Sequence, residues 1–377
     1  MKKVSILLVL AFGIISFSLN AQSQLTNINP DPNGEPWWVG NLLIPEEEDM
    51  EWITPLVLSE ASISKDLPDF VDNSEEIWFP PVFNQLDDHS CASASEISYS
   101  FTYEINRIRN VAAGGSWIEA NNDYKNLYHR YYTYNFLNNG SGTTDTYLTH
   151  ASHLVMQNGC PDLGTYWDPA LLGPDKFKYW MTGHDKYVAG MQQKISEYHE
   201  IHFNVNYESL ETLKHWIADH GNGEETGGLA VIAIRQTGYG QATLPEESPH
   251  FPDLYLTNWG TSGGHAITIV GYDEDVLCDS NGDGIYNITE DINGDGYVNL
   301  KDREVGAFKI VNSFGTSFGN EGFIWVPYRL MAEGLLHPNK AYVASAMEYE
   351  PELTIKATIR LSKNLPTYQQ KLLIKKP

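Results

Sequence analysis

The sequence has little positive charge. Its 377 residues include 24 Lys and Arg against 49 Asp and Glu, which gives a formal net charge of −25 at pH 7. Nucleic acids and anionic membrane surfaces attract basic proteins, so this balance argues against both as partners. Hydrophobic residues make up 42% and charged residues 19% of the chain, which is typical of a globular protein and not of a disordered one. The length allows two or three domains.

Long apolar runs are also scarce, and the single clear one lies at the N-terminus. Lys2 and Lys3 precede an almost wholly apolar stretch over residues 4–19, and small or polar residues follow at 20–22. This is the pattern of a secretory signal peptide, residues 1–21, cleaved after Ala21. About 16 apolar residues are marginal for a membrane span, which needs ~20. We therefore expect an exported protein, secreted or periplasmic, without a membrane anchor.

Cysteine is sparse, with Cys91, Cys160 and Cys278 as the whole set. Three is an odd number, so at least one thiol is free or pairs between molecules, and the fold is not a disulfide scaffold. Cys91 begins a helix predicted over 91–110, where apolar residues recur at steps of three and four. A helix start lowers a thiol pKa and so favours the nucleophilic thiolate. A small buried side chain at a helix start is the competing interpretation.

Helical patterns come first along the chain and strand patterns later. A second helix is predicted over 207–219. Short apolar runs bounded by glycine predict strands over 229–234, 265–272, 307–312 and 322–328. This order indicates an α+β fold. Residues 22–66 are rich in Asn, Pro, Glu and Asp and predict an extended leader or short propeptide, and alternating apolar positions after Pro351 predict a strand in a C-terminal extension, 346–377.

Three further residues form a chemical constellation with Cys91. Gln85 precedes Cys91 by six positions, His265 begins a predicted buried strand, and Asn312 ends another strand before a Gly-rich aromatic turn. These ordered motifs resemble the papain-like cysteine peptidase family over about residues 67–345. The resemblance implies a two-lobed fold with the active-site cleft between the lobes. A helical lobe, 67–200, would carry the Cys, and an antiparallel β lobe, 201–345, would carry the His and Asn.

The resemblance also implies a role for each residue in a peptidase that acts on proteins or peptides. Cys91 would attack the scissile carbonyl, and His265 would act as base and then protonate the leaving amine. Asn312 would orient the imidazole ring. Gln85 and the Cys91 main-chain N–H would stabilise the oxyanion.

The sequence departs from the family at several positions. Ala92 replaces the usual aromatic residue after the nucleophile, Asp88 replaces a common second cysteine, and Phe314 and Phe318 replace tryptophans. The leader is shorter than the family's helical inhibitory pro-region, so its inhibitory role stays open. Two alternatives also stay open: an exopeptidase or thiol acyl transferase with the same triad, and a non-catalytic calcium-dependent binding protein with a decayed site. Subsite preference and oligomeric state are not indicated by the sequence.

An acidic insertion, 275–305, lies between His265 and Asn312. Two tandem segments, 279–290 and 291–302, carry oxygen side chains at the spacing of calcium-binding loops, with glycine at the sharp turn. The predicted ligands are Asp279, Asn281, Asp283, Ile285, Asn287 and Glu290 in the first loop, and Asp291, Asn293, Asp295, Tyr297, Asn299 and Asp302 in the second. The pair resembles the duplicated calcium loops of dockerin modules. We expect two structural Ca²⁺ ions that brace the distance between His265 and Asn312, with weaker binding in the second loop because Asp302 is shorter than Glu. Two acidic turns without a metal are the alternative.

Overall fold

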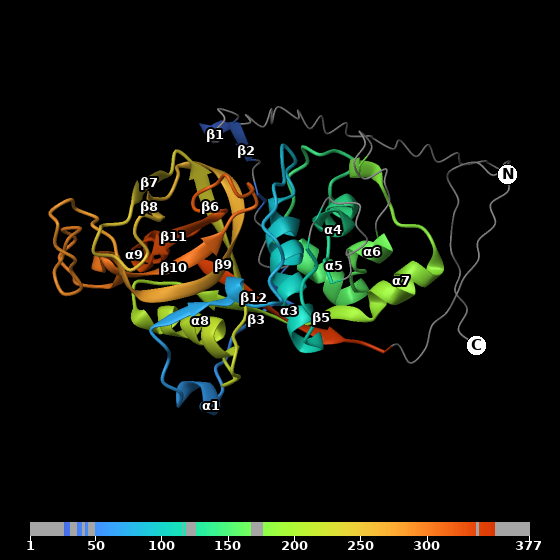
Figure 1. The fold of residues 1–377 in the computed structure, drawn as a ribbon, viewed down its shortest axis with the longest axis horizontal. Helices are drawn as coiled ribbons and strands as arrows, with labels where there is room; N and C mark the ends of the chain where they lie inside the picture. The colour runs from blue at the N-terminus through green and yellow to red at the C-terminus, as the bar shows by residue number, and fades with distance from the viewer. Residues whose placement is uncertain are drawn as a thin grey trace, which may run out of the picture.

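The computed structural model describes residues 26–30, 36–39, 42–43, 50–115, 117, 126–166, 176–336 and 339–350. A large sheet lies on one side of α3 (Thr102–Arg109), and the helices α4 to α7 lie on the other (Figure 1). The predicted α+β class is therefore confirmed. The predicted signal peptide and the predicted strand after Pro351 lie outside the described residues.

The main sheet is built around β9 (Ser262–Leu277), the longest of the described strands. β9 pairs antiparallel with β6 (Ala230–Thr237), β10 (Val305–Val311) and the short β4 (Phe70–Asp72). The order across the sheet is β3-β5-β12-β6-β9-β10-β11-β8-β7. The remaining strands of this sheet are β3 (Thr54–Pro55), β5 (Gln193–His202), β7 (Gly240–Thr243), β8 (Leu254–Asn258), β11 (Phe323–Pro327) and β12 (Lys340–Glu348). Residues 264–273 of β9 are buried without interruption, which explains the continuous apolar run there.

The helix that begins at Cys91 changes its geometry along its length. It starts as α2 (Cys91–Ser93), continues as a π-helical stretch over Ala94–Phe101, and becomes α3, which ends at Asn110 in the left-handed conformation. The other helices of this lobe are α4 (Arg130–Leu137), α5 (His150–Asn158), α6 (Leu163–Tyr166) and α7 (His184–Met191). All eight side chains of the π-helical stretch are buried, so the helix is packed on every side.

The predicted helix over 207–219 is confirmed as α8 (Tyr207–Asp219). Asn206 caps its N-terminus by accepting a hydrogen bond from Glu208 N, and His220 ends it in the left-handed conformation. Leu210, Leu213 and Ile217 are fully buried and recur at steps of three and four, so one face of the helix packs on the sheet.

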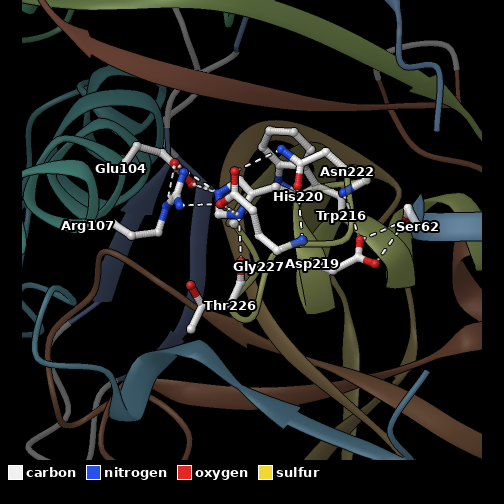
Figure 2. Close-up of polar contacts among 12 residues, drawn as sticks. Ser62, Glu104, Arg107, Trp216, Asp219, His220, Asn222, Thr226 and Gly227 are labelled. Carbon is white, nitrogen blue, oxygen red and sulfur yellow. Dashed lines mark hydrogen bonds and ion pairs between the residues drawn. The ribbon is translucent and has the colours of Figure 1, made fainter. Parts of the chain in front are cut away.

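A buried polar network joins α8 to α3 and to the leader helix α1 (Glu60–Ile63), as Figure 2 shows. Glu104 of α3 lies 3.0 Å from His220 Nε2 and 3.4 Å from Arg107 Nε. On the other side of the α8 C-terminus, the Ser62 hydroxyl donates to the Asp219 carboxylate at 2.9 Å. Because Ser62 and Asp219 are fully buried, α1 is anchored to the sheet side of the molecule.

The chain therefore uses part of the predicted leader within its fold. β3 pairs in parallel with β5, with Thr54 opposite His199 and Pro55 opposite Glu200. β5 itself crosses residue 200, where we placed the boundary between the lobes. Further upstream, β1 (Thr26–Pro30) and β2 (Pro36–Val39) form a separate two-stranded sheet. In the part of the chain that the structure describes, no helix has the length and apolar character to cross a membrane.

Candidate active site

Cys91 occupies the first position of α2, as the helical pattern predicts. Its side chain is only 4% exposed. Its thiol interacts by a hydrogen bond with the main chain of Ala266 on β9, the residue after His265. The helix start therefore brings the thiol to the strand that carries His265. The other two cysteines, Cys160 and Cys278, are also free and buried.

His265 and Asn312 come from neighbouring antiparallel strands and meet by a direct contact. His265 Nε2 lies 2.8 Å from Asn312 Oδ1. Among the described residues, His265 Nδ1 has no hydrogen-bond partner although it is buried. The asparagine thus fixes the ring through one nitrogen and leaves the other for the thiol.

Phe314 shields this contact from one face of the imidazole ring. Its ring stacks on His265 with centroids 4.7 Å apart and planes 21° apart. Phe318 in turn packs against Phe314 edge-on at 6.0 Å. His265 is fully buried and Asn312 is 2% exposed, so the hydrogen bond between them is kept from water.

Gln85 connects the segment before the helix to the segment after β10. Its main-chain N–H donates to Ser313 O at 2.7 Å, and its side-chain Oε1 accepts from the Ser313 hydroxyl at 2.5 Å. The side-chain Nε2 donates to Asp88 O at 2.8 Å. One N–H of this amide remains for an oxyanion, since the group carries two donors.

The two acidic residues before Cys91, Asp87 and Asp88, differ in burial and in hydrogen bonding. Asp87 is exposed, whereas Asp88 is buried and accepts hydrogen bonds from Ser90, from Tyr131 at 2.5 Å and from Arg130 at 3.4 Å. Arg130 thus offsets the charge of Asp88 inside the protein. Ala92 is fully buried.

Burial sets the charge states of Cys91 and His265 in this conformation. Loss of solvent raises the pKa of the Cys91 thiol to about 12, despite the opposing hydrogen bond from Ala266. Burial also lowers the pKa of His265 to about 4, against the effect of the Asn312 hydrogen bond. The thiol and the imidazole are therefore both neutral at pH 7. The helix-start effect expected from the sequence is outweighed by desolvation.

Two leader residues are bonded to segments on both sides of the site, and Leu42 belongs to the same hydrophobic cluster as Cys91. Leu42 N donates to Gly264 O at 3.2 Å, and Leu43 N donates to Thr146 O at 3.1 Å. Leu43 also pairs in parallel with Tyr147 as an isolated bridge. A Cβ on Gly264 would lie 2.7 Å from Leu42 N, so glycine is required for this close approach beside His265. The pair Leu42–Leu43 thus connects the β side of the site to the helical side.

The predicted calcium loops have closely similar main-chain geometry. In the first loop, Gly282 N and Gly284 N donate to the two carboxylate oxygens of Asp279 at 2.7 and 3.0 Å. In the second, Gly294 N and Gly296 N donate to those of Asp291, both at 2.8 Å. All four glycines have positive φ, as such turns require.

The second loop is closed by the carboxylate expected by counting, Asp302, and the first loop by a different one. Asp302 is fully buried and accepts from the main-chain N–H groups of Ile292, Asn293 and Asn299. Glu290, expected at the equivalent place in the first loop, is exposed. Glu304 lies there instead, fully buried, and accepts from Ser280 N at 2.7 Å and Asn287 N at 2.9 Å. Spacing alone did not reveal Glu304, because it lies beyond the second loop.

The carboxylates of the loops are not gathered around one point. Within the described ranges, no three Asp, Glu, His or Cys side chains lie close enough together to hold a metal ion. The expected ligand set also contains Asn side chains and main-chain carbonyls. An ion would therefore have to draw the carboxylates of each loop closer together than they lie here.

Comparisons with known proteins agree on the fold and leave the activity open. No known protein family and no curated protein matches the sequence. Among solved structures, proCathepsin B S9 from Trypanosoma congolense has a TM-score of 0.51 at 11% identity, over 82% of this chain and 86% of that one. Xylellain, a cysteine protease from Xylella fastidiosa, has a TM-score of 0.47 at 16% identity, over 86% of this chain and 96% of its own. The first likeness shows that this chain shares the fold of a procathepsin.

Proposed function

We propose that this chain is an exported papain-like cysteine peptidase that hydrolyses peptide bonds. The observation that carries the proposal is the 2.8 Å contact of His265 with Asn312, beside a thiol at a helix start. A nucleophile, a base and a group that orients the base are the parts that acyl transfer needs. The names of the solved structures with a similar fold agree with this chemistry.

The chemistry follows from the free ring nitrogen. Once substrate is bound, His265 Nδ1 takes the proton of the Cys91 thiol, and the sulfur attacks the scissile carbonyl carbon. The Cys91 main-chain N–H and the remaining N–H of Gln85 donate to the oxyanion. His265 then gives its proton to the leaving amine as the C–N bond breaks. In the second half, His265 takes a proton from water, whose oxygen attacks the thioester and releases the acid and the thiol.

This cycle requires that the leader segment leaves the cleft. With Leu42–Leu43 in position, the thiol is 4% exposed and a peptide has no path to it. We therefore include in the proposal that these residues keep the site inactive until they are displaced or cleaved. The anchored part of the leader, from β3 onward, stays with the enzyme because it belongs to the sheet.

The experiment that tests the activity is labelling with a peptidyl epoxide, which reacts with an activated thiol in a peptide-binding cleft. We expect modification of Cys91 alone, mapped by mass spectrometry, and loss of peptide hydrolysis in step with labelling. Labelling of Cys160 or Cys278 at the same rate would refute the assignment. Export is tested separately by N-terminal sequencing of the protein outside the cytoplasm, with Gln22 expected as the first residue.

Structural Ca²⁺ in the insertion is the second part of the proposal. Loop oxygens of Asp, Asn and main-chain carbonyls suit this hard cation. An ion that binds only the folded state stabilises it by RT ln(1 + [L]/Kd), or about 2.7 kcal/mol at a hundredfold excess over Kd. We expect two calcium heats in calorimetry, of which Asp283→Ala removes one and Asp295→Ala the other. If calorimetry of the wild type gives no calcium heat and a chelator leaves its melting temperature unchanged, the insertion is two acidic turns without a metal.

A further inference from the structure

A second histidine lies beside the proposed nucleophile and has a polar atom without a partner. His89 precedes Cys91 by two residues and is 3% exposed. Its Nδ1 lies 2.7 Å from Asp145 Oδ1. Its Nε2 is buried and, within the described part of the chain, makes no hydrogen bond. Buried polar atoms nearly always have a partner, so this exception calls for one that the structure does not contain.

The His89–Asp145 pair is held in place from both sides. His89 N donates to Gly142 O at 2.8 Å, which ties the turn before Cys91 to the segment that contains Asp145. The Tyr134 hydroxyl also holds this segment, 3.0 Å from both Gly142 O and Thr144 O. The orientation of the imidazole is thus fixed before any ligand arrives.

The pair also adjoins the main-chain bond between the leader and the helical side of the site. Thr146, next to Asp145, accepts the hydrogen bond from Leu43 of the leader. The charge of Asp145 is close enough to Cys91 to be among the causes that raise the thiol pKa, after burial itself. The His89–Asp145 pair is therefore a neighbour both of the thiol and of the backbone that crosses the site.

We propose that His89, held by Asp145, is a specificity-determining residue whose Nε2 binds the side chain of the substrate residue on the acyl side of the scissile bond. This rests on the proposed peptidase activity. The carbonyl that Cys91 attacks belongs to that substrate residue, so its side chain begins two bonds from the reacting carbon. His89 precedes Cys91 by two residues, and the charge of its partner Asp145 acts on the Cys91 thiol, so the pair lies near the reacting atoms.

The chemistry of the pair selects the class of side chain. Because Nδ1–H donates to Asp145, Nε2 accepts a hydrogen bond when the ring is neutral and donates one when it is protonated. A side-chain amide or hydroxyl can both donate and accept, so it pairs with either form. A carboxylate would be repelled by Asp145. An apolar side chain of the same size would leave Nε2 buried without a partner.

The test uses two fluorogenic peptide amides that differ only in the residue before the leaving amine, Gln in one and Met in the other. These side chains have similar length, but only Gln carries the amide. The full-chain protein is assayed at one pH, after thiol labelling has shown that Cys91 is accessible. We expect kcat/KM to be about ten- to hundredfold higher for the Gln substrate than for the Met substrate. The Met side chain would leave His89 Nε2 buried without a partner, and an unpaired buried polar group has a cost of this size.

Substitution then assigns the preference to the pair. His89→Phe keeps an aromatic ring but removes both nitrogens, and should bring the Gln-to-Met ratio close to one by lowering the Gln value. Asp145→Asn should reduce the Gln-to-Met ratio by less than His89→Phe does. If His89→Phe does not fold, this smaller reduction supports the assignment in its place. His202→Phe, at a histidine whose side chain is 56% exposed and pairs with Glu200, should leave the ratio unchanged.

Four outcomes would overturn the inference. Equal kcat/KM values for both substrates in the wild type would refute it and leave the peptidase intact. A wild-type preference that persists in folded His89→Phe would place the selectivity elsewhere, and loss of both activities there would make His89 essential to the reaction itself. Hydrolysis of neither substrate by protein with an accessible Cys91 would refute the proposed function and this inference with it.

Discussion

Replacing Leu42 should open the site without changing its chemistry. Leu42 is 7% exposed and belongs to the same hydrophobic cluster as Cys91, whereas its neighbour Leu43 is 37% exposed. Truncation of a buried Leu to Ala costs about 2–5 kcal/mol. We take the lower value, about 2 kcal/mol, because water can fill a site at the mouth of a cleft. In Leu42→Ala, the equilibrium constant between the covered and the open state should therefore shift toward the open state by a factor of about 30.

The assay is alkylation of Cys91 by iodoacetamide, followed by mass spectrometry. A thiol that reacts only after local opening is labelled at a rate proportional to the open population. Labelling of Cys91 should be about 30-fold faster in Leu42→Ala than in the wild type. Leu43→Ala is the matched control and should accelerate it only a few fold, because less of its side chain is buried.

Cys160 and Cys278 serve as internal references in the same experiment. Both are fully buried, and Cys278 belongs to a different hydrophobic cluster from Leu42, so together they report unfolding beyond the site. If Leu42→Ala accelerates all three thiols equally, the substitution destabilises the fold and the reasoning fails. Equal Cys91 rates in the wild type and both variants would show that Leu42 does not cover the thiol.

Further expectations concern the catalytic pair. Cys91→Ala should abolish peptide turnover, whereas Cys160→Ser should retain most of it; a fluorogenic assay distinguishes them. Asn312→Ala leaves His265 Nε2 buried without its partner, which costs about 1–3 kcal/mol. The kcat/KM should therefore fall about five- to 150-fold, and His265→Ala should lower it far more. Because burial lowers the pKa of His265 to about 4 from its ordinary 6.5, the unfolded chain binds more protons between these values. The wild-type protein should therefore lose stability as pH falls through this window, more steeply than His265→Phe, and parallel melting curves for the two would contradict this.

Local patterns in the sequence were enough for the elements that hold the site. The steps of three and four in 207–219 describe one buried face, and α8 forms there because the face packs on the sheet. The short apolar runs correspond to β6, β9, β10 and β11. These four strands are consecutive neighbours in the sheet. Cys91 at a helix start follows from the same kind of local signal.

Contacts between distant segments were not accessible in this way. β5 begins inside residues 67–200, which we expected to form a helical lobe, and its pairing depends on β12, from Lys340 to Glu348. β3 joins the sheet through only two residues, Thr54 and Pro55, which no periodicity marks. Leu42 approaches Gly264 across more than half of the chain length. Register between such partners is decided by tertiary packing, so a single sequence does not specify it.

The burial of the catalytic pair suggests how the site is activated. The hydrogen bond between His265 and Asn312 and the stacking of Phe314 are already formed while Leu42 is bonded to Gly264. Desolvation is the largest cause of both pKa shifts, and it keeps the thiol and the imidazole neutral. When the leader leaves, water reaches the pair and the main cause of both shifts weakens, so the thiol pKa should fall and the imidazole pKa should rise. The position of Cys91 at a helix start then adds its effect in the same direction. Activation would therefore need a change of solvation, with no rearrangement of the residues that carry the chemistry.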